Sequence, residues 1–456
     1  MAQLPPIRAE IIELQSGKRT SPSEFQEKVR ARAQFLQTLG IQPRDRVALV
    51  AVHGLDFLED LFALIELRAV PCILEQSHTA RERETIETMI RPQFFVDRKK
   101  VEKRVADNGP ALPENTALII FTSGTSSTPK AVVHKYENLA FRFEAARQAL
   151  GESSMEVMIA LLPLHFAHGL FGICMASLFH SRCLLLPPDL SIATFSQTAR
   201  WVDEYGVTFL SGTPATWNLI LRFSKPPQAK TLRRVQMASA HAASKLFSDL
   251  RQWAGCDVWN VYGTSETASW MSDYRVDVST PPDAVGDGSA WGARFEILSP
   301  DQAGRGEVRV YTRSLFAGYL GDELQPRPFF DTKDVGWIDE HGVLRLEGRM
   351  VRVINMGGLK VSPEEVELRL RESSDVVDAF VLSIPSLSGV SGIGGLVVLR
   401  EGVELKACLP GLIESLRKTL SAHKIPTVWK ATDKIPRRSN GKPDLKEIGL
   451  QWEKLS

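Results

Sequence analysis

Residues 117–130 read ALIIFTSGTSSTPK, an apolar run that passes directly into a loop of small hydroxyl residues and ends at Pro129 and Lys130. The apolar run predicts a buried strand. In the loop, backbone amides, hydroxyl groups and the Lys130 ammonium could together bind phosphate oxygens. The loop is not a Walker A sequence, because no glycine precedes Lys130 and Ala131 follows it in place of Ser or Thr. Taken alone, the segment fits a polar surface loop as well as a phosphate site.

The sequence on both sides of this segment alternates short apolar runs with helical stretches. The runs VALVAV (47–52) and VPCIL (70–74) flank an amphipathic stretch at 55–68. The same alternation returns beyond residue 137, with apolar runs at 183–187 and 207–212. Strand, helix, strand is the order of a parallel sheet covered by helices, so we expect two α/β units of similar kind.

Two further helices are expected in the first half of the chain. Ser21 and Glu24 match the capping box that starts a helix, and Pro22 occupies the first helical position. The most apolar stretch, 158–188, is interrupted by Pro163, three histidines and Arg182, so it contains no uncharged run of the roughly 18 residues that could span a bilayer. We expect a buried core helix over 169–179.

The pattern of apolar and polar residues changes after about residue 290. Short alternating segments at 307–312 and 342–349 predict antiparallel or barrel-like strands. A further unit should begin near residue 350, and its Gly/Ser-rich segment 386–395 predicts a flexible loop. In this unit we expect strands at 351–355 and 376–382, helices at 363–372 and 408–420, and a polar tail.

Composition excludes several classes of protein. The 456 residues include 55 Lys and Arg against 54 Asp and Glu, and this formal net charge of +1 disfavours nucleic acid as a partner. Hydrophobic residues make up 43% and charged residues 24%, which excludes disordered and fibrous chains. The five cysteines form no C-x-x-C pair and predict free thiols in a reducing, cytoplasmic setting. They are Cys72, Cys174, Cys183, Cys256 and Cys408.

Three other segments contain chemically suggestive residues. In NVYGTSET (260–267), a glycine permits close backbone approach, Tyr262 offers a flat face for a base, and Glu266 could hold Mg²⁺. In DVGW (334–337), an acid suited to ribose hydroxyls precedes Arg349, although a hairpin with a surface ion pair is the commoner arrangement. In PRRSNGKP (436–443), a turn presents Lys442, and a basic turn is usually solvated surface.

In their order and spacing, these segments resemble the adenylate-forming (AMP-binding) superfamily of acyl- and aryl-CoA synthetases, adenylation domains and luciferases. TSGTSSTPK resembles its phosphate loop, YGTSET its Y-G-x-T/S-E core, and DTKDVGWIDEHGVLRLEGR its ribose-binding segment. GGLKVSPEEVE resembles a strand of its C-terminal domain, and RRSNGKPDL resembles its catalytic-lysine loop. Five ordered motifs over about residues 20–450 make the resemblance specific.

The resemblance implies an α/β fold with a large and a small domain. The large N-terminal AMP-binding domain (1–349), whose N-terminal part is shortened, would contain two α/β sheets plus a small β-barrel. A smaller, mobile α+β C-terminal lid domain would cover 352–456. The implied enzyme joins a small carboxylic acid to AMP with loss of pyrophosphate and then passes the acyl group to a thiol.

The resemblance also assigns roles to residues. Lys442 would supply the cation between the acid and the α-phosphate, and Glu266 would bind Mg²⁺. The implied ATP site comprises Thr122, Ser123, Gly124, Thr125, Ser126, Lys130, Ser239, Ala240, Tyr262, Gly263, Thr264, Ser265, Asp334 and Arg349. The implied acid pocket comprises His165, Phe166, His168, Gly169, Trp217, Ala238 and His241, and Gly357 and Gly358 would let a pantetheine arm pass.

Several activities remain as hypotheses. The leading one is an ATP-dependent acyl- or aryl-CoA ligase, and the second is a stand-alone adenylation enzyme that loads the phosphopantetheine of a carrier protein in a biosynthetic pathway. A non-catalytic nucleotide-binding module would be expected to lose Glu266 or Lys442, and both are present. A serine hydrolase is disfavoured because no G-x-S-x-G occurs, and a dinucleotide oxidoreductase because 286–291 and 392–397 lack the third glycine.

Overall fold

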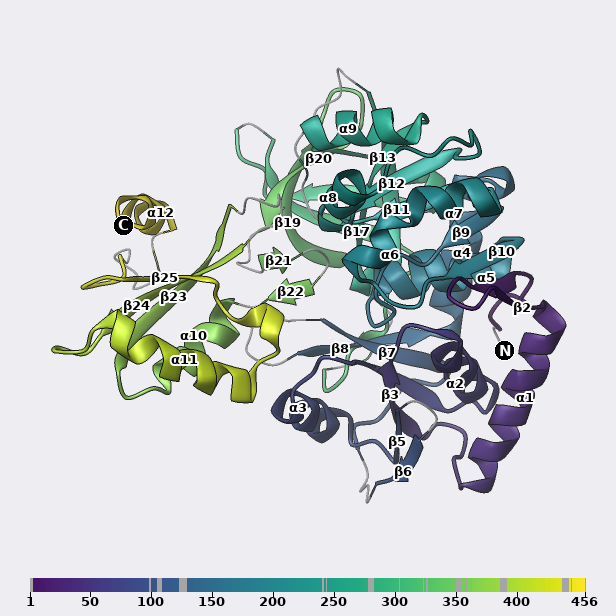
Figure 1. Cartoon of the computed structure of the whole chain (residues 1–456), viewed down its shortest axis with the longest axis horizontal. Helices are drawn as coiled ribbons and strands as arrows, with labels where there is room; N and C mark the ends of the chain where they lie inside the picture. Colours follow the sequence, from purple (N-terminus) through teal and green to yellow (C-terminus); the bar gives the residue numbers. More distant parts are fainter. Residues whose placement is uncertain are drawn as a thin grey trace. The chain divides into compact units, whose positions relative to one another are not determined.

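A computed structural model describes residues 3–97, 100–104, 109–122, 129–239, 242, 244–277, 283–302, 304–322, 324, 327–349, 354–356, 359–361, 363–385, 392–436, 443 and 445–455. The chain divides into two compact units (Figure 1). The first comprises Met1–Gln76, Glu87–Thr122 and Lys130–Met350. The second comprises Ser77–Ile86, Ser123–Pro129 and Val351–Ser456.

The first unit contains a seven-stranded sheet. In spatial order its strands are β18 (Gly318–Tyr319), β8 (Lys130–Lys135), β7 (Thr116–Thr122), β4 (Val70–Glu75), β3 (Arg46–Ala51), β5 (Phe94–Asp97) and β6 (Lys100–Lys103). The central strands β7, β4, β3 and β5 pair in parallel, as the strand and helix alternation predicts. The helix α2 (Leu55–Glu66) packs on β3 and β4, and α1 (Pro22–Thr38) packs on α2 (Figure 1).

A second sheet of the same unit has eight strands. In spatial order these are β14 (Ser269–Val276), β13 (Val258–Thr264), β12 (Arg234–Ala238), β11 (Phe209–Gly212), β9 (Val157–Ile159), β10 (Cys183–Leu186), β1 (Glu10–Glu13) and β2 (Lys18–Thr20). Its two faces bury different cores, because Val157 and Ile159 belong to one hydrophobic cluster and the intervening Met158 to another. The prediction of two α/β sheets is therefore confirmed.

Helices cover both faces of this second sheet. They are α4 (Tyr136–Leu150), α5 (Ala176–His180), α6 (Ile192–Ser196), α7 (Thr198–Tyr205), α8 (Pro214–Phe223) and α9 (Ser244–Ala254). Short helical turns complete the covering at η1 (Glu152–Met155), η3 (Ser265–Thr267) and η4 (Ser289–Trp291). The sequence therefore alternates as predicted over most of its first 270 residues.

The predicted small barrel corresponds to a five-stranded antiparallel sheet. Its order is β15 (Ala284–Gly286), β20 (Leu344–Arg349), β19 (Phe330–Ile338), β17 (Gly306–Thr312) and β16 (Ala293–Leu298). In the described part of the chain, the edge strands β15 and β16 do not pair with one another. The antiparallel pairing expected after residue 290 is confirmed, whereas a closed barrel is not observed.

Two helical segments match their sequence signals in different ways. The Ser21 hydroxyl accepts a hydrogen bond from the Glu24 amide, and the Glu24 carboxylate accepts one from the Ser21 amide, so α1 has the predicted capping box. The single core helix predicted over 169–179 consists of a π-helix, η2 (His168–Met175), followed by α5. All its residues from His168 to Phe179 are buried. The prediction is correct for burial and incomplete for geometry.

The described part of the second unit contains two small sheets and four helices, one of them only in part. One sheet pairs β21 (Ile354–Met356) with β22 (Leu359–Val361), and the other has the order β23 (Val376–Ile384), β24 (Gly392–Leu399), β25 (Val428–Ala431). The helices are α3 (Ala80–Ile90), which continues into the first unit, α10 (Pro363–Arg371), α11 (Leu405–Thr419) and α12 (Leu445–Lys454), with a turn η5 (Ala422–Lys424). The predicted polar tail is wrong for residues 445–454, because they form an amphipathic helix that buries Ile448.

The loop predicted over 386–395 is also wrong in part, because residues 392–395 form the start of β24. The glycines there allow aromatic side chains to lie directly on the strand. A side-chain carbon at Gly394 would lie 2.6 Å from the Trp452 ring, and one at Gly395 would lie 2.7 Å from the Trp429 ring. The glycines indicate close packing in this strand, and flexibility was the wrong interpretation of them.

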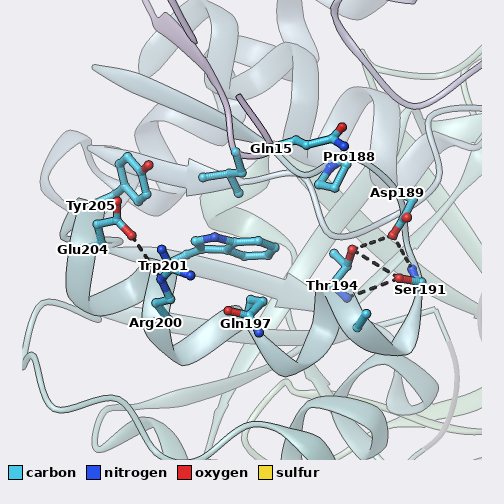
Figure 2. Close-up of a pocket in the computed structure, with 12 residues that line it drawn as sticks. Gln15, Pro188, Asp189, Ser191, Thr194, Gln197, Arg200, Trp201, Glu204 and Tyr205 are labelled. Atoms are coloured by element: carbon cyan, nitrogen blue, oxygen red, sulfur yellow. Dashed lines mark hydrogen bonds and ion pairs between the residues drawn. The ribbon is translucent and has the colours of Figure 1, made fainter. Parts of the chain in front are cut away.

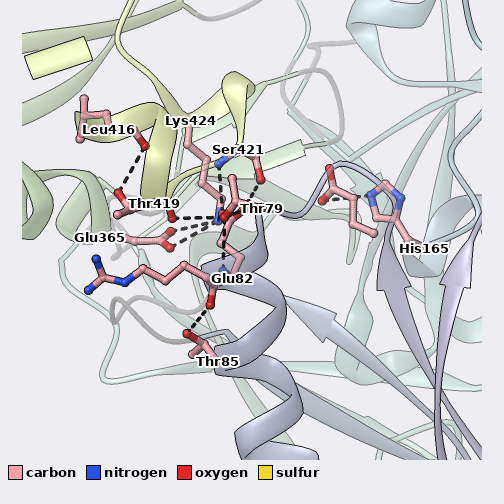
Figure 3. A network of polar contacts seen from close by, with 11 residues as sticks. Thr79, Glu82, Thr85, His165, Glu365, Leu416, Thr419, Ser421 and Lys424 are labelled. Atoms are coloured by element: carbon pink, nitrogen blue, oxygen red, sulfur yellow. Dashed lines mark hydrogen bonds and ion pairs between the residues drawn. The ribbon is translucent and has the colours of Figure 1, made fainter. Parts of the chain in front are cut away.

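A buried ion cluster anchors residues 77–86 within the second unit (Figure 3). The Lys424 ammonium lies 2.6 Å from Glu82 Oε1 and 3.2 Å from Glu365 Oε2, and all three side chains are less than 10% exposed. Ser421 Oγ and the Thr79 amide also donate to Glu82. Burial would raise the pKa of Glu82, but Lys424 and these donors lower it to about 2. Burial also raises the pKa of Glu365.

Two other sequence expectations bear on the whole chain. All five cysteines are unpaired, as predicted, and three of them are buried. In the described ranges, no helix combines the length and the apolar character needed to cross a membrane.

Replacing Lys424 by Met should strongly destabilise the second unit. The substitution leaves Glu82 and Glu365 buried without their cation, and breaking a buried pair in this way costs about 3–5 kcal/mol. The measurement is the free energy of unfolding from urea titration. Lys245→Met is the matched control, because its partner Asp249 is an exposed helical neighbour. Equal stabilities of the two variants would contradict a structural role for the cluster.

Candidate active site

One group of the predicted site residues lies where parallel strands of the eight-stranded sheet end. The strands β11, β12 and β13 run side by side and end at Gly212, Ala238 and Thr264. In open α/β sheets, the carboxyl ends of the strands are where ligands bind. Ser239, Tyr262 and the turn around Glu266 therefore lie at the edge at which a ligand is expected.

The predicted phosphate loop is bracketed by a strand pair in the seven-stranded sheet. Thr122, the last residue of β7, pairs with Lys130, the first residue of β8, in an antiparallel ladder. Both residues are half-buried. The pairing fixes the two ends of the loop that the sequence assigns to phosphate, and it holds Lys130 at the loop's exit.

Glu266 sits in a tight turn between β13 and β14. Gly263 lies so close to the Ser269 carbonyl that an added side-chain carbon would be 2.0 Å from that oxygen, so only glycine fits. Ala268 and Ser269 both adopt left-handed backbone conformations, with φ of 53° and 88°. Thr267 Oγ1 donates to the carbonyls of Thr264 and Ser269 and braces the turn.

The Glu266 carboxylate is held from the other large sheet. The Tyr319 hydroxyl, on β18, donates to Glu266 Oε1 at 2.8 Å, and the Phe316 amide donates to the Glu266 carbonyl at 2.8 Å. Lys130 Nζ lies 4.5 Å from the centroid of the same Tyr319 ring. A carboxylate and an ammonium group that the sequence assigned to the metal and the phosphates thus share one aromatic side chain.

His134, on β8, lies behind this cluster. It is completely buried, and its ring packs edge to face on Phe171 at 5.1 Å. Burial lowers the pKa of His134 to about 4, although the nearby Glu266 carboxylate favours the charged form. His134 is therefore neutral above about pH 5, and it adds no positive charge beside Glu266.

Tyr262 and Asp334, which the sequence assigns separately to the adenine and the ribose, contact one another. The Tyr262 hydroxyl donates to Asp334 Oδ2 at 2.6 Å, and both residues are less than 8% exposed. On the neighbouring strand, Arg349 pairs with Asp334 in the β19–β20 ladder. The three residues assigned to the nucleoside are therefore adjacent.

Two histidines of the predicted acid pocket have different surroundings. His165 Nε2 lies 3.6 Å from Glu75 Oε2 at the end of β4, and both side chains are about one-sixth exposed (Figure 3). His168 is almost fully buried, and its two ring nitrogens contact the hydroxyls of Ser211 and Ser239. His165 is thus more accessible than His168 for polar contact with a ligand.

The other described pocket residues separate into two groups. Phe166 and Ala238 belong to the same hydrophobic cluster, and Gly169 packs so closely on the Pro163 carbonyl that no side chain fits there. Trp217 lies in the cluster on the opposite face of the sheet, where its Nε1–H donates to the Gln236 carbonyl at 2.9 Å. The structure does not bring Trp217 together with the histidines.

Several predicted site residues lie outside the described residues. They are Ser123, Gly124, Thr125, Ser126, Ala240, His241, Gly357, Gly358 and Lys442, and for Arg349 the backbone alone is described. In the ranges that the structure covers, no cluster of three or more His, Cys, Asp or Glu side chains could hold a metal. A single carboxylate at Glu266 still suits Mg²⁺, which commonly takes one or two protein carboxylates together with substrate phosphates.

A separate pocket of about 370 Å³ opens beside α6 and α7 (Figure 2). Trp201 forms its floor, and Gln15, Gln197, Arg200 and Tyr205 are among its polar lining residues. It shares no residue with the predicted ATP or acid sites.

Sequence reasoning missed four residues that contact the predicted site: Tyr319, His134, Glu75 and Ser211. Tyr319 follows a glycine but meets Glu266 only because β18 pairs with β8. His134 is four residues after Lys130, and no prediction was made for it from the sequence. Glu75 and Ser211 stand at the carboxyl ends of apolar runs, and that position is the one signal that could have identified them.

The profile of the AMP-binding enzyme family matches residues 2–112 and 97–320 of the chain. The chain belongs to this family. The predicted membership of the adenylate-forming superfamily is thereby confirmed, and with it the prediction of an AMP-forming acid–thiol ligase.

Relatives of this AMP-binding enzyme cover most of its length. An oxalate–CoA ligase of Arabidopsis thaliana is 26% identical over 464 residues, which are 91% of this chain and 89% of that protein. The acyl-CoA synthetase ALT10 of Alternaria alternata is 30% identical over 381 residues, 74% of this chain and 66% of that protein. The o-succinylbenzoate CoA synthetase (MenE) of Bacillus subtilis has a similar fold, with a TM-score of 0.83, 19% identity and coverage of 98% and 96% of the two chains.

Replacing Tyr319 by Phe should lower the catalytic efficiency with Mg²⁺ and ATP. A hydrogen bond to a charged group contributes about 1.5–3 kcal/mol, so we expect kcat/KM for ATP to fall at least about tenfold. The measurement is adenylation rate against Mg²⁺ and ATP concentration. Tyr311→Phe is the matched control, because the Tyr311 hydroxyl also bonds a glutamate, Glu296, in the five-stranded sheet. A similar loss in both variants would show that Tyr319 acts through stability alone.

Proposed function

We propose that this enzyme activates a small carboxylic acid with ATP and transfers the acyl group to CoA. The observation that carries the proposal is the arrangement of Glu266 and Lys130 around the Tyr319 ring. It unites a buried carboxylate and an ammonium group at the base of the loop that the sequence assigns to phosphate. The chain's similarity to CoA ligases over most of their length supports the same activity.

In the first step proposed, a carboxylate oxygen of the acid bonds to the α-phosphorus of ATP, and the bond to pyrophosphate breaks. Both reactants are anionic, so cations must lower their repulsion. We propose that Lys130 and the residues Thr122 to Ser126 bind the pyrophosphate end and that Lys442 neutralises the charge between the reactants. Mg²⁺, held by Glu266, would neutralise phosphate charge when bound.

The nucleoside would be held by the contacts around Asp334. We propose that the Asp334 carboxylate accepts hydrogen bonds from the ribose hydroxyls, with Arg349 on the adjacent strand. The hydrogen bond from Tyr262 fixes the orientation of that carboxylate before the ligand arrives. The Tyr262 ring, with Ser239 and Ala240, would then frame the adenine. A preoriented carboxylate loses less freedom on binding and so favours affinity.

In the second step proposed, the thiol sulfur attacks the acyl carbonyl carbon, AMP leaves with the bonding electron pair, and the thiol proton passes to solvent. We propose that residues 352–456 form the mobile lid domain and that Gly357 and Gly358 let the pantetheine arm pass. A carrier protein remains the alternative acceptor. Incubation with CoA and, separately, with a phosphopantetheinylated carrier would distinguish the two, because each yields a different thioester.

The substrate acid would occupy the region of His165, Phe166, Gly169 and Ala238. No aspartate occurs in 163–169, the region in which an α-amino group would be paired with a carboxylate in peptide-synthetase adenylation domains, and this argues against ordinary α-amino acids. Pyrophosphate exchange into ATP across short, fatty, aryl and amino acids tests the proposal directly. Absence of exchange with every acid would overturn it.

Replacing Lys442 by Ala should separate the two half-reactions. We expect adenylate formation to fall by about a hundredfold or more, because the cation between two anions is lost in the first step. Thioester formation from a preformed acyl-adenylate should change little. Lys434→Ala, an exposed lysine on the same segment, is the matched control. Equal losses in both half-reactions would contradict the role proposed for Lys442.

A further inference from the structure

His168 connects two neighbouring strand ends through its ring. Its Nδ1 lies 3.0 Å from Ser239 Oγ, the residue that follows β12, and its Nε2 lies 2.8 Å from Ser211 Oγ on β11. Both serine hydroxyls face the ring, and Ser211 is 1% exposed. The three side chains form a Ser211–His168–Ser239 bridge from the start of η2 to the edge of the sheet.

The ring at the centre of this bridge has little freedom. Two aromatic rings pack edge to face with it: the ring centroid of Trp270 lies 5.4 Å from that of His168 at an interplanar angle of 70°, and that of Phe166 lies 6.4 Å away at 83°. Burial lowers the pKa of His168 to about 3, so the imidazole is neutral in ordinary buffers. A neutral imidazole has one donor and one acceptor nitrogen, so the two serines must take opposite roles. The two hydrogen bonds of the bridge therefore run in one direction, and the ring between them is held in place by its packing.

The residue that the bridge holds has an unusual backbone. Ser239 has φ of 74°, in the left-handed region that glycine, asparagine and aspartate adopt more readily than serine. Such a conformation persists where surrounding contacts favour it. Ser239 leads directly into Ala240 and His241, to which the sequence assigns the adenine and the acid. His168 thus contacts the residue that directly precedes these two predicted site residues.

We propose that Ser211 and His168 are positioning residues, which hold Ser239, a residue of the predicted adenine site, in its left-handed conformation. This inference rests on the proposed function for the identity of the ligand. It adds Ser211, which no motif indicated, and it gives His168 a role that needs no contact with the substrate. It also joins the acid-side segment 165–169 to the nucleotide-side turn through a single imidazole ring.

Ser239 offers a direct test, because two substitutions separate its backbone from its hydroxyl. Ser239→Ala removes the hydroxyl and retains a side chain that disfavours φ of 74°, whereas Ser239→Gly removes the hydroxyl and adopts this φ freely. We expect AMP affinity, measured by calorimetry, to fall about tenfold in the alanine variant. The glycine variant should retain more of the wild-type AMP affinity than the alanine variant, because glycine adopts this φ without support from the bridge.

Ser211→Ala tests the far end of the bridge. We expect AMP affinity to fall about fivefold, as for the loss of one buried hydrogen bond, and amide hydrogen exchange to accelerate in the peptide spanning 236–247. Ser177→Ala is the matched control, because Ser177 is fully buried on α5 and its hydroxyl has no hydrogen-bond partner in the described structure. The control should change neither measurement.

Three outcomes would overturn the proposal. A glycine variant as weak as the alanine variant would show that the Ser239 hydroxyl contacts the ligand directly. If Ser211→Ala changes neither AMP affinity nor amide hydrogen exchange, Ser211 does not position Ser239. If Ser239→Ala changes neither measurement, the conformation of Ser239 does not depend on the bridge. If the wild type neither binds AMP nor forms an adenylate, the proposed function fails, and the exchange measurements alone still decide whether the bridge holds the turn.

Discussion

The hydrogen bond from Tyr319 to Glu266 joins the two large sheets of the first unit. Glu266 belongs to the turn after β13 in the eight-stranded sheet, and Tyr319 belongs to β18 at the edge of the seven-stranded sheet. The backbone bond from Phe316 to the Glu266 carbonyl reinforces the same junction. Since Lys130 starts β8, beside β18, the position of Lys130 relative to the carboxylate that we propose to bind Mg²⁺ depends on this junction. The Tyr319 side chain therefore links the packing of the two sheets to the geometry of the proposed site.

The sequence was sufficient to predict two α/β sheets and antiparallel strands after them, because strand and helix periodicity is a local signal. Runs such as 47–52 and 70–74 became paired parallel strands, and Ser21 and Glu24 formed the expected cap. The errors came from residues whose role depends on distant partners. Gly394 and Gly395 indicated flexibility in isolation, but in the structure they are sites of close packing against the indoles of Trp452 and Trp429.

In the candidate site, too, local motifs could be identified from the sequence and contacts between distant segments could not. Motif order identified Glu266, Lys130, Tyr262 and Asp334, and the structure brings them into two contacting groups. Ser211 and Tyr319 could not be identified in this way, because each meets its partner only after strands distant in sequence have paired. Trp217 shows the converse case, in which a residue near the strand ends in sequence faces the opposite core.

The packing of Trp452 on Gly394 has a consequence for the segment that contains Lys442. Lys430 Nζ, on β25, donates to the Trp452 carbonyl at 2.9 Å, so α12 is tied to β25 as well as to β24. The described elements that precede and follow the predicted catalytic-lysine loop are therefore attached directly to one another. A larger residue at Gly394 would displace the Trp452 ring and should weaken the attachment of α12 to the sheet.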